Sequence, residues 1–166
     1  MIQLPTDAIF IWVGGALDGY TRLLARYVPA TLPERHHYVH WYQHRRLRQL
    51  MHRYPAAQLV LIGHSYGATT AAQLVAQGHQ VALLITIDPV GRRPIAMAQV
   101  AKYCQHWLNF RAADTRNNFA NWVARLGGWW QQKPQAHAHQ HIDIQADHAL
   151  IVSEVMPLFT QFKQAR

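Results

Sequence analysis

Runs of consecutive apolar residues alternate along this chain with stretches in which apolar residues recur at helical spacing. Three of the runs are apolar at nearly every position, which is typical of strands buried on both faces of a sheet. Three weaker segments are marked by aromatic and β-branched residues or by partial alternation. In chain order, the six predicted strands cover residues 8–13, 37–42, 58–62, 81–87, 103–110 and 139–144.

The segments between these strands have the apolar spacing of amphipathic helices. The predicted helices cover residues 20–27, 45–54, 68–77, 95–101 and 148–163. Pro157 is expected to bend or split the last of them. Strands that alternate with helices indicate a parallel sheet with helices on both faces. The expected fold class is therefore α/β, a three-layer α/β/α sandwich with a mostly parallel sheet of about six strands, in a single domain over residues 1–166.

Residues 114–135 are rich in Asn, Gly and Trp, and we expect either a small lid or a long excursion there. Its apolar residues would form a flap over a site or contact a lipid surface, and ordinary packing of an irregular segment explains them equally well. These residues are Phe119, Trp122, Leu126, Trp129 and Trp130.

The chain is basic, with a formal net charge of +8 and 12 further histidines. Such a charge attracts nucleic acid, anionic lipid or an acidic partner. Because the basic residues form no long tract, we expect a basic surface without a specific nucleic-acid site. The only cysteine, Cys104, excludes an internal disulfide. No signal peptide or membrane-spanning run is evident, so we expect a cytoplasmic protein, with export that needs no N-terminal signal left open.

The most informative stretch is the pentapeptide at residues 63–67, which reads Gly-His-Ser-Tyr-Gly. It joins a predicted buried strand to a predicted helix of small residues, which is the context that gives the G-x-S-x-G pattern its chemical meaning. Glycines on either side of Ser65 let neighbouring chain pass close to a strained turn. The pattern predicts a nucleophilic serine at the edge of the sheet.

Three motifs together resemble the α/β-hydrolase superfamily: residues 63–67, the Ile-Asp-Pro at 87–89 and the Asp-His at 147–148. The chain is similar to a compact serine esterase or lipase of that family, beginning at the family's third strand. The resemblance implies a catalytic triad in the order serine, acid, histidine. An acid directly after the strand that follows the nucleophile helix resembles certain lipases.

A serine hydroxyl needs a base within hydrogen-bond reach, and a histidine suits this role near neutral pH. We predict His148, since it follows the last strand, at the edge where catalytic groups of a parallel sheet gather. Asp88, at the end of the strand next to the serine's strand, is the preferred acid that orients the histidine. Asp114 is its rival, because most relatives in the family carry the acid one strand later. Asp147 is interpreted as a helix cap.

The resemblance also implies an oxyanion hole built from backbone N–H groups. One would come from Tyr66, directly after the serine, and the other from Gly15 or Ala16 in the loop after the first strand. The predicted reaction is hydrolysis of carboxylic esters through an acyl-enzyme on Ser65. The alternatives are a thioesterase or other acyl hydrolase, and a non-catalytic protein that binds through its basic, aromatic surface.

The expected partner is an acyl ester, either a small molecule or a lipid, with contact to a membrane surface left open. The alternating histidines His137, His139 and His141 would put three imidazoles on one face of a strand, where metal ligands sometimes lie. Exposed strand histidines explain the pattern more simply, and we expect neither a metal nor a cofactor.

Overall fold

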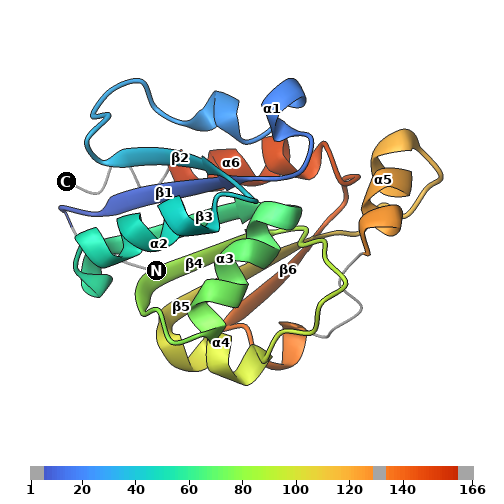
Figure 1. The fold of residues 1–166 in the computed structure, drawn as a ribbon. Coiled ribbons are helices and arrows are strands. Elements are labelled where there is room, and N and C mark those ends of the chain that lie inside the picture. The colour runs from blue at the N-terminus through green and yellow to red at the C-terminus, as the bar shows by residue number, and fades with distance from the viewer. Residues whose placement is uncertain (1–5, 129–133, 161–166) are drawn as a thin grey trace.

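The computed structural model describes residues 6–128 and 134–160, and these form a six-stranded sheet between two layers of helices (Figure 1). The strands lie in the order β2-β1-β3-β4-β5-β6, and every neighbouring pair is parallel. Their bounds are β1 Ile9–Gly14, β2 His36–His40, β3 Leu59–His64, β4 Val81–Ile87, β5 Cys104–Ala112 and β6 Gln140–Ile144. The predicted α/β class and the six predicted strands are confirmed.

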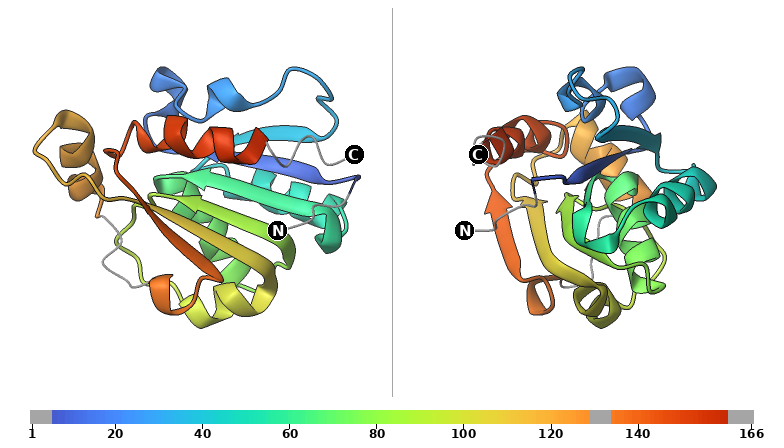
Figure 2. Two further views of the ribbon diagram at one scale, coloured as in Figure 1. Left: turned by 180° about the vertical axis from the view of Figure 1, so that it is seen from behind. Right: turned by 90° about the vertical axis from the view of Figure 1, so that its left-hand side faces the viewer.

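Three helices pack on one face of the sheet, and the last helix packs on the other with the segment after β1 (Figure 2). The first group is α2 (His44–Arg53), α3 (Tyr66–Ala76) and α4 (Met97–Tyr103), and the last helix is α6 (Ile151–Thr160). The remaining elements are α1 (Asp18–Thr21), α5 (Phe119–Gly127) and three short 3-10 turns, η1 (Ala25–Tyr27), η2 (Ala56–Gln58) and η3 (Pro134–Ala136). None of the helices in the described residues is long and apolar enough to cross a membrane.

Each central strand contributes side chains to two separate apolar cores. In β3, Leu59 and Leu61 face the core under α2 and α3, while Val60 and Ile62 face the core under α6. Because successive side chains of a strand point to opposite faces, a strand covered on both sides must be apolar at every position. This requirement explains why β3 and β4 are continuous apolar runs in the sequence.

The helix predicted over residues 20–27 is instead two short pieces, α1 and η1, separated at Arg22. Arg22 has a left-handed backbone, with φ of 51°, which ends the first piece. The buried carboxylate of Asp18 accepts the backbone N–H groups of Leu24 (2.7 Å) and Ala25 (3.2 Å). These bonds turn the chain around Asp18, and the sequence pattern, which records only apolar spacing, does not reveal them.

Residues 114–135, expected to be an irregular excursion, contain the well-formed helix α5. Asn118 caps its start by accepting the N–H of Asn121 (2.8 Å), and Gly128 ends it with φ of 87°. Figure 1 shows α5 standing beyond one end of the sheet, apart from both helix layers.

The closing helix begins after a turn capped by Asp147, whose carboxylate accepts the N–H groups of Ala149 and Leu150 (both 2.9 Å). This agrees with the interpretation of Asp147 as a cap. Pro157 lies inside α6, which continues past it to Thr160, so of the two expected effects the helix does not show a split. The final residues of the predicted helix, 161–163, lie outside the described part of the chain.

Candidate active site

Ser65 lies in the sharp turn between β3 and α3. Its backbone has φ of 57°, a conformation that costs a non-glycine residue about 1–3 kcal/mol. The two flanking glycines make the turn sterically possible. A Cβ on Gly63 would lie 2.6 Å from the Ala68 nitrogen, and one on Gly67 would lie 2.0 Å from the Val13 oxygen. The strained turn therefore depends on glycine at both positions and presents the Ser65 hydroxyl at the carboxyl end of the sheet.

His148 lies between Ser65 and Asp88 and is hydrogen-bonded to both. Its Nε2 is 3.0 Å from Ser65 Oγ, and its Nδ1 is 2.6 Å from Asp88 Oδ2. All three residues are buried, with exposed fractions of 7% for Ser65, 6% for His148 and 1% for Asp88. A carboxylate only accepts hydrogen bonds, so the neutral ring carries its proton on Nδ1. Its Nε2 is then free to accept the serine proton.

The Asp88 carboxylate is held in place by the neighbouring strand. Its Oδ1 accepts the N–H of Ala112 (3.0 Å), and its own N–H donates to the Phe110 carbonyl (2.8 Å). The residue has φ of 40°, which turns it out of β4 toward His148. Asp88 is thus aimed at the imidazole by bonds at both its backbone and its side chain.

Asp114, the rival acid, has a different partner. Its carboxylate accepts hydrogen bonds from Arg116, the shortest at 2.6 Å, and these bonds lower its pKa below the usual range. Of the two candidates, Asp88 is the one that the structure places against His148.

The residues predicted to form the oxyanion hole lie next to Ser65. A Cβ on Gly15 would lie 2.9 Å from the Ser65 Cβ, so the backbone of Gly15 passes directly over the serine. Tyr66 is the first residue of α3, and the first N–H groups of a helix have no partner within it. Gly15, Ala16 and Tyr66 line one cavity together with Ser65 and His148. The six predicted site residues are therefore brought together at one edge of the sheet.

This cavity has a volume of about 120 Å³. Its wall is mainly apolar and includes Leu17, Leu23, Val90, Phe119 and Val123. The last two residues belong to α5, so the predicted lid forms one side of the cavity. The same helix exposes large apolar side chains to solvent, which are those of Phe119, Trp122 and Leu126. Trp129 and Trp130 lie outside the described residues.

Comparison with known proteins gives the family. Residues 23–149, more than half of the chain, match the model of the alpha/beta hydrolase fold. The chain belongs to the α/β-hydrolase fold family. The family predicted from the three sequence motifs is thus confirmed. No curated protein matches the sequence.

Two solved α/β-hydrolase structures illustrate the likeness in fold. The thioesterase domain from the curacin biosynthetic pathway is 10% identical, with a TM-score of 0.57 over 99% of this chain and 93% of that chain. The esterase domain of a Rhodothermus marinus protein is 18% identical, with a TM-score of 0.54 over 96% and 89% of the two chains.

The structure also places two of the alternating histidines and the single cysteine of the chain. His139 accepts the N–H of Trp107 (3.0 Å) and His141 contacts Asn109 (2.9 Å), so both rings are engaged in the sheet. Among the described residues, no three His, Cys, Asp or Glu side chains gather as a set of metal ligands. Cys104 is buried at the start of β5, and burial raises the pKa of its thiol to about 12, which makes it a poor nucleophile.

His64, directly before the serine, is fully buried beside His148. Its Nε2 lies 3.0 Å from the His148 carbonyl, which requires that this nitrogen carry a proton, and the two rings are 4.8 Å apart. Burial, and the nearby His148, lower the pKa of His64 to about 4. His64 is therefore neutral near pH 7, and its hydrogen bond to the His148 carbonyl helps to hold the backbone of His148.

Acidification is expected to destabilise the protein through His64. Between pH 6.5 and pH 4, unfolded His64 binds a proton that folded His64 does not, so stability is full above pH 6.5 and falls toward pH 4. The loss from this residue is about 3 kcal/mol. Urea unfolding of wild type and His64→Gln across this range should show a flatter pH dependence in the variant. Parallel curves would contradict a neutral, buried His64.

The structure adds one more residue that the sequence analysis missed. Asn121 of α5 is completely buried, and its side-chain oxygen accepts the N–H of His148 (3.0 Å). Asn118 in the cap position signals a helix start, but nothing in the local sequence shows that this helix touches the histidine.

Proposed function

We propose that this protein is a serine hydrolase that cleaves carboxylic esters through an acyl-enzyme on Ser65. One observation carries the proposal: the unbroken hydrogen-bond chain from Ser65 Oγ through the His148 imidazole to the Asp88 carboxylate. All three groups are buried and belong to three separate segments of the chain. Such an arrangement supplies a nucleophile, its base and the group that orients the base.

In the proposed reaction, Ser65 Oγ attacks the ester carbonyl while His148 Nε2 takes the hydroxyl proton. Asp88 stabilises the imidazolium that forms, without taking the proton itself. The negative charge on the carbonyl oxygen is received by backbone N–H groups of Tyr66 and of Gly15 or Ala16. His148 then gives its proton to the leaving alcohol. A water molecule attacks the acyl-enzyme in the same way, which releases the carboxylic acid and restores Ser65.

The size and the lining of the cavity limit which acyl groups can fit. Its volume of about 120 Å³ lies below the range of about 300–1,000 Å³ that is usual for drug-sized ligands. The apolar side chains around Ser65, among them Leu23, Val90 and Val123, suit a short hydrocarbon chain. We therefore propose short-chain acyl esters as the preferred substrates.

The similar structures support hydrolysis of an acyl bond in general. One is described as an esterase domain and the other as a thioesterase domain. Both descriptions are compatible with attack of a serine on an acyl carbonyl. Nothing in the cavity described here favours a thiol leaving group, so the ester is proposed first.

The proposal is tested by hydrolysis of 4-nitrophenyl esters from acetate to decanoate. We expect turnover with kcat/KM highest for the short esters and declining once the acyl chain exceeds the cavity. A matched pair of an oxygen ester and a thioester with the same acyl group compares the two leaving groups. Absence of hydrolysis with every ester would contradict the proposal, and a preference for long chains would contradict the proposed substrate class.

A further inference from the structure

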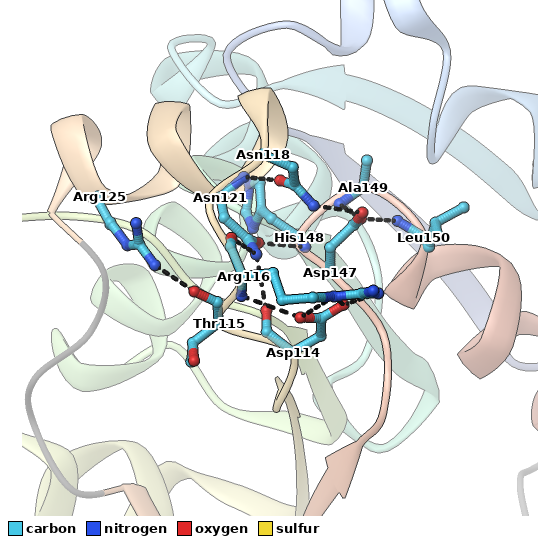
Figure 3. Close-up of polar contacts among 10 residues, drawn as sticks. All are labelled: Asp114, Thr115, Arg116, Asn118, Asn121, Arg125, Asp147, His148, Ala149 and Leu150. Carbon is cyan, nitrogen blue, oxygen red and sulfur yellow. Dashed lines mark hydrogen bonds and ion pairs between the residues drawn. The ribbon is translucent and has the colours of Figure 1, made fainter.

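We infer that Asn121 is a positioning residue for His148, and that α5 is a fixed wall of the active site rather than a flap that opens. The inference rests on the proposed function, because it assigns a residue that keeps the proposed base in place. It follows from the polar contacts between α5 and the segment that carries His148 (Figure 3).

The side chain of Asn121 is fully engaged between two segments. Its Oδ1 accepts the backbone N–H of His148 (3.0 Å). Its Nδ2 donates to the carbonyls of Asp114 (2.7 Å) and Arg116 (2.9 Å), in the loop that follows β5. The side chain has an exposed fraction of 0%. A buried amide whose oxygen and nitrogen are both bonded is held firmly, so it fixes the position of the His148 backbone relative to that loop.

A second contact joins the start of α5 to the segment that carries His148, next to the Asn121 contact. Asn118, at the start of α5, donates from Nδ2 to Asp147 Oδ2 (2.9 Å), and the other oxygen of Asp147 caps the turn after His148. Figure 3 shows Asn118 and Asn121 side by side, facing Asp147 and His148. Asp147 and His148, two consecutive residues, are therefore both tied to α5 and its cap.

The far end of α5 is also anchored to the site. Tyr66, the residue after the nucleophile, donates its hydroxyl to the Gly127 carbonyl (2.9 Å), and Arg92 donates to the Leu126 carbonyl (2.8 Å). Outward movement of the helix would break contacts at both ends. The base would lose its anchor at the moment when substrate enters. A helix held in this way serves as a wall.

The same helix carries part of the acyl-binding wall. Phe119, Ala120 and Val123 line the cavity, and Asn121 lies between them in the chain. The position of the base is thus linked to the surface that the acyl group contacts. Loss of the Asn121 side chain is expected to act mainly on kcat, because it displaces the base without removing apolar wall residues.

The test compares Asn121→Leu with a matched control, Arg125→Met. Arg125 lies on the same helix and bonds to Asn117 (2.6 Å) and to the Thr115 carbonyl, so its loss also weakens the anchoring of α5. For Asn121→Leu, we expect kcat and the rate of fluorophosphonate labelling to fall about 10- to 100-fold, with KM changed less than about threefold. For Arg125→Met, we expect both rates within about twofold of wild type. If Asn121→Leu fails to fold, Asn121→Ala replaces it, and we expect the same fall in kcat and in the labelling rate.

A second measurement does not depend on activity. We expect the proton on His148 Nδ1 that faces Asp88 to give a downfield ¹H NMR signal in wild type, which is lost or shifted in the Asn121 variant and retained in Arg125→Met. If wild type neither turns over esters nor labels at Ser65, the proposed function fails, and the NMR comparison still tests the positioning role. Unchanged kcat and an unchanged signal in folded Asn121→Leu would overturn the inference. Equal losses in the two variants would also overturn it, by showing a general effect of loosening α5.

Discussion

Ser65→Ala is expected to lower kcat for ester hydrolysis by about 10⁴- to 10⁶-fold, because it removes the only atom to which the acyl group is transferred. The histidine base and the backbone N–H groups cannot compensate, since no covalent intermediate can form. The measurement is steady-state hydrolysis of the best short-chain ester. Residual activity above the rate in water would reflect binding and the oxyanion hole alone.

Ser153→Ala provides the matched control. Ser153 lies exposed on α6 and donates its hydroxyl to the Leu150 carbonyl (2.7 Å), as many helix-surface serines do. Its removal should leave kcat unchanged. Equal activity of Ser65→Ala and wild type would show that hydrolysis, if observed, proceeds without the proposed nucleophile.

Asp88→Asn is expected to lower kcat about 10³- to 10⁴-fold. The amide keeps the size of the carboxylate, but it bears no charge to stabilise the imidazolium. Its NH₂ group would also favour the tautomer in which Nε2, not Nδ1, carries the proton. The Nδ1 contact of 2.6 Å makes this substitution a direct test of the acid. The measurement is kcat and kcat/KM with the same ester.

Asp114→Asn is the control for this acid and should retain kcat within a factor of about three, because a surface ion pair contributes little. The Asp114 carboxylate bonds to Arg116, and its link to the site runs through its backbone carbonyl, which the substitution leaves in place. Activity that survives in Asp88→Asn but is lost in Asp114→Asn would overturn the assignment of the acid.

The strands and the serine turn could be predicted because their requirements are visible in a few consecutive residues of the sequence. A strand buried on both faces must be apolar throughout, as residues 81–87 are, and a turn as tight as that at Ser65 requires glycines at fixed spacing. In a parallel sheet the strand ends meet at one edge. This is why Asp88 and His148, 60 residues apart, could be expected at the same edge, while the resemblance of the Ile-Asp-Pro motif to certain lipases favoured Asp88 over Asp114.

The parts that could not be predicted depend on contacts between distant segments. The break at Arg22 follows from the buried Asp18 carboxylate, which gathers N–H groups from residues further along the chain. Asn121 contacts His148 across 27 residues, in a segment whose Asn and Gly content resembles that of a loop. Polar residues in such segments are ambiguous, since the same side chain is a loop residue or a buried anchor depending on what folds over it.

The most direct test of a nucleophilic Ser65 is the mass of the intact protein after reaction with a fluorophosphonate, followed by mapping of the modified peptide. The arrangement of Ser65, His148 and Asp88 predicts one adduct per chain, located on Ser65, and none in Ser65→Ala. Folded wild-type protein that acquires no adduct, or one whose adduct maps to another residue, would contradict the account.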